Sequence, residues 1–357
     1  MNYLKSATEF LINRAYPLLD GTTAQEGLSL PENYAFQPHH QSKMVGWSHY
    51  GIMIPDLPTP HHFFSIMSVI GTSGALAFDT DHALKSSPRH NATAVMGTAA
   101  THPHQFQGYA IDHDCQFAED GSHIQFGNNI VITGQYPHYH VTARSQDFEL
   151  NIEITNTDKV SWFVKTPVYD HISVLSQYRG SITYQNQTQQ IQGLCTFEHA
   201  ACISPYLLRD KPLPAHLKIP LDFFTYQIIN LDENTQLLLN DTRVNDVKIV
   251  SKAYLRGIHE YSQSYHAEFE VLQFQNQPAI SPDDVSMQLP QTFRWVVTDH
   301  NGNLLITIEG QVDTPFTYGL GSGYVGGYQY QGSYQNRLIQ GRGYIEYIDR
   351  RAIEHRA

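Results

Sequence analysis

YGLGSGYVGGYQYQGSYQNRLIQGRGYIEYID, residues 318–349, holds seven tyrosines and eight glycines in 32 positions. Tyrosine or glycine occupies every second position from Tyr328 to Tyr334, and the same spacing returns from Gly341 to Tyr347 after a break at 335–337. Alternation with a period of two is typical of β-strands, so the stretch predicts an antiparallel hairpin with one aromatic face. Glycines in such strands allow the sharp bends that a closing barrel requires.

Three glycines of the same stretch, Gly321, Gly323 and Gly326, match the G-x-G-x-x-G string of dinucleotide-binding proteins. That string binds a nucleotide only where it joins a strand to a helix within a βαβ unit. No helical pattern follows it in this chain, so the sequence favours a chance match. We therefore expect no cofactor.

Most of the chain shows the same strand character, in short segments separated by turn residues. The pairs Asp120-Gly121 and Asn301-Gly302, each between apolar runs, predict tight hairpins. Residues 4–18 carry apolar side chains at helical spacing, which predicts one short amphipathic helix. Frequent short strands with few helices predict an all-β fold of barrels or sandwiches.

The length of 357 residues is sufficient for two domains that each bury a core. The segments SQDFELNIEITN at 145–156 and SYHAEFEVLQFQN at 264–276 resemble each other and support two similar units. We expect the change from one unit to the other within 167–180. The predicted division is an N-terminal helix and arm over residues 1–43, a first barrel domain over 44–175 and a second over 176–357.

Acidic residues outnumber basic ones, with 34 Asp and Glu against 22 Lys and Arg and a formal net charge of -12. No basic cluster stands out, which argues against nucleic acid as a partner. Three cysteines without a C-x-x-C motif fit a reducing compartment, so we expect a cytoplasmic protein. No stretch reaches the roughly 20 apolar residues of a transmembrane helix. The N-terminal helix either packs across one end of a barrel or rests on a membrane surface.

Histidine is frequent, at 20 residues, and several histidines stand in pairs. The pairs are His39-His40, His61-His62, His102-x-His104 and His138-x-His140. A zinc site needs three or four converging ligands, whereas an H-x-H pair supplies two. The spacings therefore favour surface and half-buried imidazoles over a metal site, and we expect no bound metal.

Three polar residues stand out within apolar surroundings. Glu198 and His199 lie inside the apolar segment 193–206, and Asp222 precedes the apolar-aromatic segment 223–231. Burial disfavours the charged form of a carboxyl group, so these residues are either paired structural groups or acids that can donate a proton. Nucleophilic catalysis has no comparable signal, because the chain lacks a G-x-S-x-G motif.

At these residues the chain resembles the two-domain, lipocalin-like (calycin) superfamily of bacterial carotenoid hydratases, or hydroxyneurosporene synthases, and AttH-like proteins. Its closest resemblance is to an uncharacterised bacterial family. The segments that carry it are WSHYGIMIPDLP (47–58), IPLDFFTYQI (219–228), YGLGSGYVGGYQYQG (318–332) and GRGYIEYID (341–349). The resemblance implies two tandem lipocalin-like antiparallel β-barrels, a short N-terminal helix and an apolar ligand.

The resemblance also implies site residues. In the carotenoid hydratases a histidine and an aspartate help protonate a double bond before water adds. These roles correspond to His199 and Asp222 here, with Asp222 as the acid and His199 and Glu198 orienting it. The ligand-binding residues implied are Trp47, His49, Tyr226, Tyr328 and Tyr330. The hydratases have aromatic residues two places after the histidine and two before the aspartate, where this chain has Ala201 and Pro220.

The sequence leaves three functions open. The first is binding of a hydrophobic small molecule, lipid-, isoprenoid- or polyketide-like, in a barrel or between domains. The second is cofactor-independent catalysis by a hydratase, isomerase or cyclase, with Asp222 as general acid. The third is a structural or protein-interaction role, for which no specific residue argues. The oligomeric state stays open as well.

Overall fold

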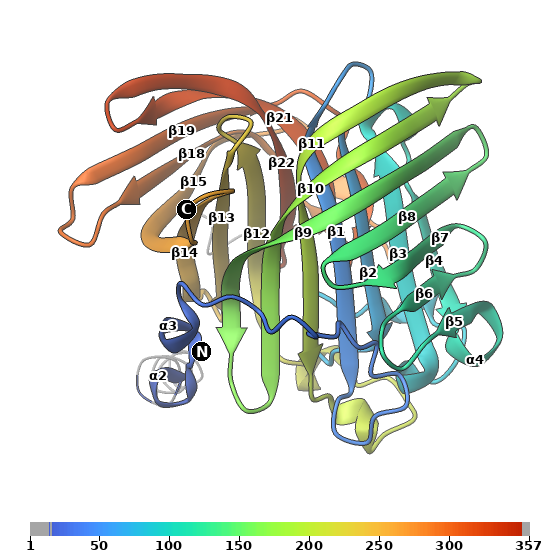
Figure 1. Ribbon diagram of the computed structural model, residues 1–357. Helices are drawn as coiled ribbons and strands as arrows, with labels where there is room; N and C mark the ends of the chain where they lie inside the picture. Colours follow the sequence, from blue (N-terminus) through green and yellow to red (C-terminus); the bar gives the residue numbers. More distant parts are fainter. Residues whose placement is uncertain (1–13, 15, 352–357) are drawn as a thin grey trace.

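The computed structural model describes residue 14 and residues 16–351, and it consists of two antiparallel β-barrels packed side by side (Figure 1). Strands β1, β9, β10 and β11 of the first barrel lie next to the second barrel, where β1 contacts β12 and β22, and β9 contacts β14. The prediction of an all-β fold with two tandem lipocalin-like barrels is confirmed.

The first sheet has 11 strands in the order β4-β3-β2-β1-β11-β10-β9-β8-β7-β6-β5. Its edge strands β4 and β5 are consecutive in the chain and are joined by the single helical turn α4 (Ile111–Asp114), so the sheet is nearly closed. The strands are β1 (Trp47–Leu57), β2 (His62–Gly71), β3 (Asn91–Thr98), β4 (Gln105–Ala110), β5 (Cys115–Phe117), β6 (His123–Phe126), β7 (Ile130–Gln135), β8 (His138–Ser145), β9 (Phe148–Lys165), β10 (Tyr169–Tyr184) and β11 (Gln187–Cys202).

The second sheet has nine strands in the order β19-β18-β15-β14-β13-β12-β22-β21-β20, and an additional pairing of β19 with β21 closes the barrel. The strands are β12 (Leu221–Asn230), β13 (Thr235–Val244), β14 (Val247–Gly257), β15 (Gln263–Phe274), β18 (Pro290–Thr298), β19 (Leu304–Val312), β20 (Thr317–Leu320), β21 (Gly323–Tyr334) and β22 (Arg337–Asp349). The pair β16 (Ala279–Ile280) and β17 (Ser286–Met287) forms a separate small sheet. Short 3-10 turns are η2 (Asp81–Ala83), η3 (Pro88–His90), η4 (Ala99–Thr101), η5 (Pro205–Leu207) and η6 (Ala215–Leu217).

The tyrosine- and glycine-rich hairpin is the element that closes the second barrel. Strand β21 pairs with β19 on one side and with β22 on the other, and β22 pairs in turn with β12. The turn residues Gln335 and Asn336 both have positive φ, as a two-residue turn that matches the strand twist requires. The G-x-G-x-x-G string lies in the β20–β21 turn and in β21 itself, where a strand follows and not a helix.

The predicted boundary between residues 175 and 176 falls inside β10, which pairs along its length with β9 and β11 of the first sheet. By sheet membership the division lies between Cys202 and Leu221. The mixed polar and apolar residues of 167–180 are typical of a boundary segment, but in the structure Ser173 and Ser176 are buried within the long strand β10. Whether each sheet folds as an independent domain stays a prediction.

The N-terminal arm touches both barrels. The predicted helix over 4–18 lies mostly outside the described residues. Within the described residues, α2 (Tyr16–Leu19) and α3 (Thr22–Gln25) are helical. The backbone N–H of Ser264 in the second barrel donates to the Glu26 carboxylate, and the Phe36 ring packs on Phe197 of the first barrel. The arm therefore runs across the junction and contacts both barrels (Figure 1). No helix within the described ranges is long and apolar enough to cross a membrane.

Candidate functional site

A cavity of about 400 Å³ lies between the two barrels. Strands β1, β2, β9, β10 and β11 contribute to one wall, and β12, β13, β14, β20 and β22 contribute to the other. The main apolar side chains of the lining are Trp47, Met67, Phe78, Phe163, Leu221 and Phe224. A volume of this size falls in the range of about 300–1,000 Å³ that small-molecule sites occupy. The cavity therefore has the size and the apolar walls of a ligand site.

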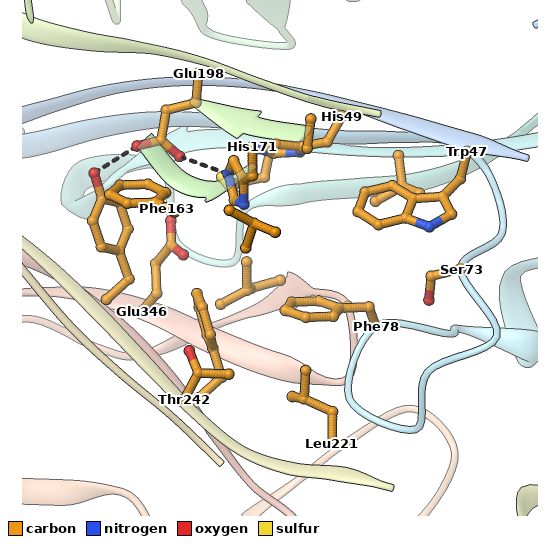
Figure 2. Close-up of a pocket in the computed structure, with 18 of the residues that line it drawn as sticks. Trp47, His49, Ser73, Phe78, Phe163, His171, Glu198, Leu221, Thr242 and Glu346 are labelled. Atoms are coloured by element: carbon orange, nitrogen blue, oxygen red, sulfur yellow. Dashed lines mark hydrogen bonds and ion pairs between the residues drawn. The ribbon is translucent and has the colours of Figure 1, made fainter. Parts of the chain in front are cut away.

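Three ionisable side chains of the first barrel meet at one end of the cavity (Figure 2). His49 on β1 and His171 on β10 are both register partners of Ala200, from opposite sides of β11. Glu198 lies two residues before Ala200 and so shares its face of the strand. Because the Ala200 side chain is small, the two imidazoles come together, with ring centroids 5.9 Å apart.

The second barrel contributes Tyr226 and Glu346, which are register partners on β12 and β22. The Tyr226 hydroxyl donates to Glu198 Oε1 across the junction at 2.5 Å. Glu346 Oε1 accepts a hydrogen bond from the Tyr344 hydroxyl at 3.0 Å. Both glutamates are buried, so the cavity holds two carboxyl groups that are shielded from bulk water.

Hydrogen bonds orient the two imidazoles. His49 Nδ1 donates to the Ser68 carbonyl oxygen at 2.7 Å, which leaves the lone pair on Nε2. His171 Nδ1 lies 3.2 Å from the Tyr169 hydroxyl, and its Nε2 lies 3.9 Å from Glu198 Oε2. The buried Nε2 of His171 has no hydrogen-bond partner within the described part of the chain.

The surroundings move the pKa values of the two carboxyl groups in opposite directions. Burial, together with repulsion from Glu198, raises the pKa of Glu346 well above its usual range. Burial alone would raise the pKa of Glu198, but attraction from His171 at 3.9 Å and the hydrogen bond from the Tyr226 hydroxyl outweigh it and lower that pKa. Burial and repulsion from His171 lower the pKa of His49 to about 4. These shifts favour an ionised Glu198, a protonated Glu346 and a neutral His49.

Four of the predicted site residues lie together in the cavity lining, and they are Trp47, His49, Glu198 and Tyr226. The predicted acid-orienting partner His199 does not, because neighbouring residues of a strand point to opposite faces. His199 Nε2 donates to the Gln37 carbonyl oxygen at 2.9 Å, and the ring packs on Tyr50 in the first barrel core. Burial lowers the pKa of His199 to about 3, so the ring stays neutral there.

The predicted general acid Asp222 lies outside the cavity lining. It is half-buried at the start of β12, next to an irregularity between Leu221 and Phe223, and Leu221 is the residue that lines the cavity. The Asp222 carboxylate accepts from the backbone N–H of Asp246 at 3.1 Å and so stabilises the β13–β14 turn. This contact is a structural one.

The predicted ligand-binding residues Tyr328 and Tyr330 belong to the core of the second barrel and not to the cavity. The Tyr328 ring packs edge-on against Phe293 with centroids 4.9 Å apart. The structure places two other residues in the cavity that the sequence did not single out, His171 and Glu346. Glu346 has the same sequence feature as Glu198, a lone carboxyl within an apolar strand, whereas His171 lies in the segment 167–180, where the domain boundary is predicted.

Two solved structures share this architecture over nearly their whole length. An AttH-like protein of Nitrosomonas europaea matches with a TM-score of 0.60 and 15% identity, over 91% of this chain and 98% of that one. Kievitone hydratase of Nectria haematococca matches with a TM-score of 0.59 and 11% identity, over 90% of this chain and 93% of that one. At these identities the likeness shows the shared fold and not a shared reaction.

One curated protein is similar over part of the chain. The splicing factor U2AF 23 kDa subunit of Schizosaccharomyces pombe is 28% identical over 137 residues. The match covers 36% of this chain and 59% of that protein, so the chain spans about three-fifths of the length of this curated relative. A partial match at this identity leaves the fold assignment unchanged.

The predicted fold of two lipocalin-like barrels is therefore shared with two solved structures over nearly their whole length. The narrower relationship comes from a family model that matches residues 67–357 and so includes most of the first barrel and all of the second. The chain belongs to the family of unknown function DUF6670.

Proposed function

We propose that the protein binds a predominantly apolar small molecule in the cavity between its barrels, with the polar end of that molecule at Glu198 and Glu346. The observation that carries this proposal is the cavity of about 400 Å³ with aromatic and aliphatic walls and its histidine and glutamate side chains gathered near one another. Burying an apolar ligand there is favourable at about 25 cal/mol per Å² of apolar surface removed from water. The fold neighbours include a hydratase, which is consistent with a small organic ligand.

Substitution of Val69 to Phe tests the binding function. Val69 lines the cavity, so a phenyl ring there fills space that the ligand needs. We expect wild-type protein to enhance the fluorescence of an apolar probe and to yield a co-purified ligand by mass spectrometry, and Val69→Phe to lose both. The matched control is Val168→Phe, because Val168 is exposed in the turn after β9. Equal probe binding by wild type and Val69→Phe would contradict the proposal.

A second candidate is acid-catalysed hydration or dehydration of the bound molecule. The specific observation is Glu346, a buried carboxyl on the cavity wall whose pKa is raised. A protonated Glu346 can donate its proton to an alkene carbon, after which water adds to the cation and returns a proton to the carboxylate. Aromatic faces such as that of Phe163 stabilise the developing positive charge. Glu346 here takes the role that the sequence predicted for Asp222.

Substitution of Glu346 to Gln separates catalysis from binding. The amide keeps the shape and the acceptor for the Tyr344 hydroxyl but cannot donate an acidic proton. With the co-purified ligand incubated in heavy water, we expect wild type to introduce deuterium into carbon positions and Glu346→Gln to lose that activity while probe binding persists. Asp222→Asn serves as the control and should keep it. Undiminished deuterium incorporation by Glu346→Gln would remove Glu346 from the mechanism.

A further inference from the structure

We propose that His49, His171 and Glu198 form a binding site for a divalent transition-metal cation, with an open coordination position that faces the apolar cavity. The ligand atoms of the three side chains lie within 4.8 Å of one another. Within the described ranges, no other group of three or more His, Cys, Asp or Glu side chains meets this spacing. The proposal concerns the cation alone and does not depend on the ligand-binding function proposed above.

The three donors come from a rigid frame. Strands β1, β11 and β10 are adjacent and antiparallel, and continuous pairing holds them through the site. His49 and His171 flank Ala200, and Glu198 projects from the same strand face two residues away. Donors on neighbouring strands keep their separation more closely than donors on loops, which favours a defined metal geometry.

The hydrogen bonds around the three side chains are those that metal ligands have in proteins. A ligating imidazole usually donates its other ring N–H to a carbonyl or carboxylate, and His49 donates Nδ1–H to the Ser68 carbonyl oxygen at 2.7 Å. Ligating carboxylates are themselves hydrogen-bonded, and Glu198 Oε1 accepts from the Tyr226 hydroxyl. Each contact leaves one metal-ligating atom of its side chain available for a cation, namely His49 Nε2 and Glu198 Oε2.

An unsatisfied atom points independently to a missing partner. His171 Nε2 is buried without a hydrogen-bond partner among the described residues, and the nearest acidic atom, Glu198 Oε2, is 3.9 Å away. Buried polar atoms are nearly always paired, and leaving one unpaired costs about 1–3 kcal/mol. A cation between these two atoms would satisfy the nitrogen lone pair and the carboxylate oxygen together.

The charges of the cavity favour the same conclusion. Glu198 lines it, while none of its described lining residues is Lys or Arg. A carboxylate shielded from water needs a counter-charge, and a divalent cation bound to Glu198 supplies one. The nearby Arg256 does not fill this role directly, because its guanidinium donates to Ser173 and Gln236.

The donor set indicates the class of metal. Two imidazoles and one carboxylate suit Zn²⁺ and, with further open positions, Fe²⁺, whereas Ca²⁺ and Mg²⁺ prefer all-oxygen sites. In a tetrahedral site with bonds of about 2.1 Å the donor atoms lie about 3.4 Å apart. Small side-chain rotations bring donors from within 4.8 Å to that spacing. Three protein ligands leave the fourth position to water or to a bound molecule, as in catalytic zinc sites.

The experiment measures metal on full-length protein purified without a polyhistidine tag. The protein is stripped with a chelator, and Zn²⁺ and Co²⁺ alone are titrated back, with bound metal measured by elemental analysis and Co²⁺ ligand-field absorption. The ligand variants are His171→Ala and Glu198→Gln, and Tyr226→Phe removes only the hydroxyl that donates to Glu198. The control is the double variant His138→Ala/His140→Ala, which removes an exposed pair on β8 that does not line the cavity.

We expect one equivalent of Zn²⁺ per chain and a four- or five-coordinate Co²⁺ spectrum. Affinity should fall by about 100-fold or more in His171→Ala and Glu198→Gln, and by about 10–100-fold in Tyr226→Phe, which keeps its ring packing. The double surface variant should match wild type. Near-UV circular dichroism establishes that each variant is folded, and Tyr226→Phe gives the result should a ligand variant fail to fold.

Three outcomes would overturn the proposal: no stoichiometric metal in the wild type, equal affinity in wild type and all cavity variants, or loss of metal in the surface variant only. The third outcome would assign the metal to the His138–His140 pair. The result is separable from the proposed ligand binding, because Zn²⁺ and Co²⁺ titrations contain no apolar ligand. Metal bound by a protein that binds no apolar probe would support this inference and reject the other.

Discussion

Glu198 and His199 are neighbours in the sequence that serve different surroundings. Glu198 faces the second barrel and accepts from Tyr226, whereas His199 packs in the first barrel core. Residue type marks both as unusual within an apolar strand, but only the strand face separates a cavity group from a core group. Among the buried histidines outside the site, His104 shows how such a core imidazole acts on stability.

His104 should make the protein less stable in mild acid. Burial, opposed by a hydrogen bond to the Thr98 carbonyl oxygen and reinforced by repulsion from His102, lowers the pKa of His104 from 6.5 to about 4. Below pH 6.5 the unfolded chain takes up a proton that the folded chain refuses, so stability falls as the pH drops towards 4. From pH 7 to pH 5 this contributes about 2 kcal/mol to the loss.

Substitution of His104 to Gln isolates that contribution. Gln cannot titrate and keeps a donor for the Thr98 carbonyl oxygen. In urea unfolding at pH 7 and pH 5, we expect the variant to lose about 2 kcal/mol less than wild type. The control His138→Gln, on an exposed residue of β8, should follow the wild-type pH dependence. The same loss in His104→Gln as in wild type would show that His104 does not carry it.

The hairpin β21–β22 depends on glycines that make room for the tyrosines opposite them. Tyr328 is the register partner of Gly343, and Tyr330 is the partner of Gly341. The Tyr328 ring lies over Gly343, and a Cβ at that glycine would come within 2.4 Å of the ring. The spacing of tyrosine and glycine thus indicates a strand, and it also places tyrosine rings of β21 over glycines of β22.

Gly343→Ala should therefore destabilise the second barrel. Tyr328 is fully buried and cannot move aside without disturbing the core, so we expect the free energy of unfolding to fall by about 2 kcal/mol. Gly257→Ala is the matched control at the end of β14, where the nearest atom to the new Cβ is 3.5 Å away. Urea unfolding of both variants measures the difference. A loss in Gly343→Ala no greater than in Gly257→Ala would contradict this account.

The two barrels are fastened by polar as well as apolar contacts. Arg256 on β14 is buried and donates to the Ser173 carbonyl oxygen on β10 at 2.6 Å and to Gln236 Oε1 on β13 at 2.8 Å. Burial lowers the pKa of Arg256 to about 10, so it remains charged at neutral pH. The Phe163 ring of the first barrel packs on Tyr226 and Tyr254 of the second. These contacts join the two barrels, and Phe163 and Tyr226 also line the cavity.

Arg256→Met should loosen the junction. Methionine fills part of the volume but leaves the Ser173 and Gln236 oxygens without their donor, and we expect a loss of about 3 kcal/mol in unfolding free energy. Apolar-probe binding in the cavity should weaken with it. The exposed Arg294→Met is the control, and loss of its surface ion pairs should cost less than about 1 kcal/mol. Equal stability of the two variants would show that Arg256 does not hold the barrels.

Much of the fold followed from local patterns. Alternating tyrosine and glycine in 318–349 predicted the hairpin, and short strands between turn residues predicted the all-β class, because side-chain period reports strand geometry directly. The domain boundary did not follow, since Ser173 and Ser176 are polar residues typical of a connecting segment, yet they are buried within β10. Local composition distinguishes strands from helices more readily than long strands from linkers.

The candidate site could also be predicted only in part from the sequence. Residue type marked Glu198, because a carboxyl within an apolar strand is costly unless it has a partner. The family resemblance marked Trp47, His49 and Tyr226. The partners themselves came from the pairing of β1 with β11 and β10, which brings His49 and His171 to either side of Ala200. Which of two adjacent residues faces the cavity, and that Glu346 joins them from the other barrel, depends on strand register and barrel packing. These relations join residues far apart in the chain, and so no local pattern in the sequence carries them.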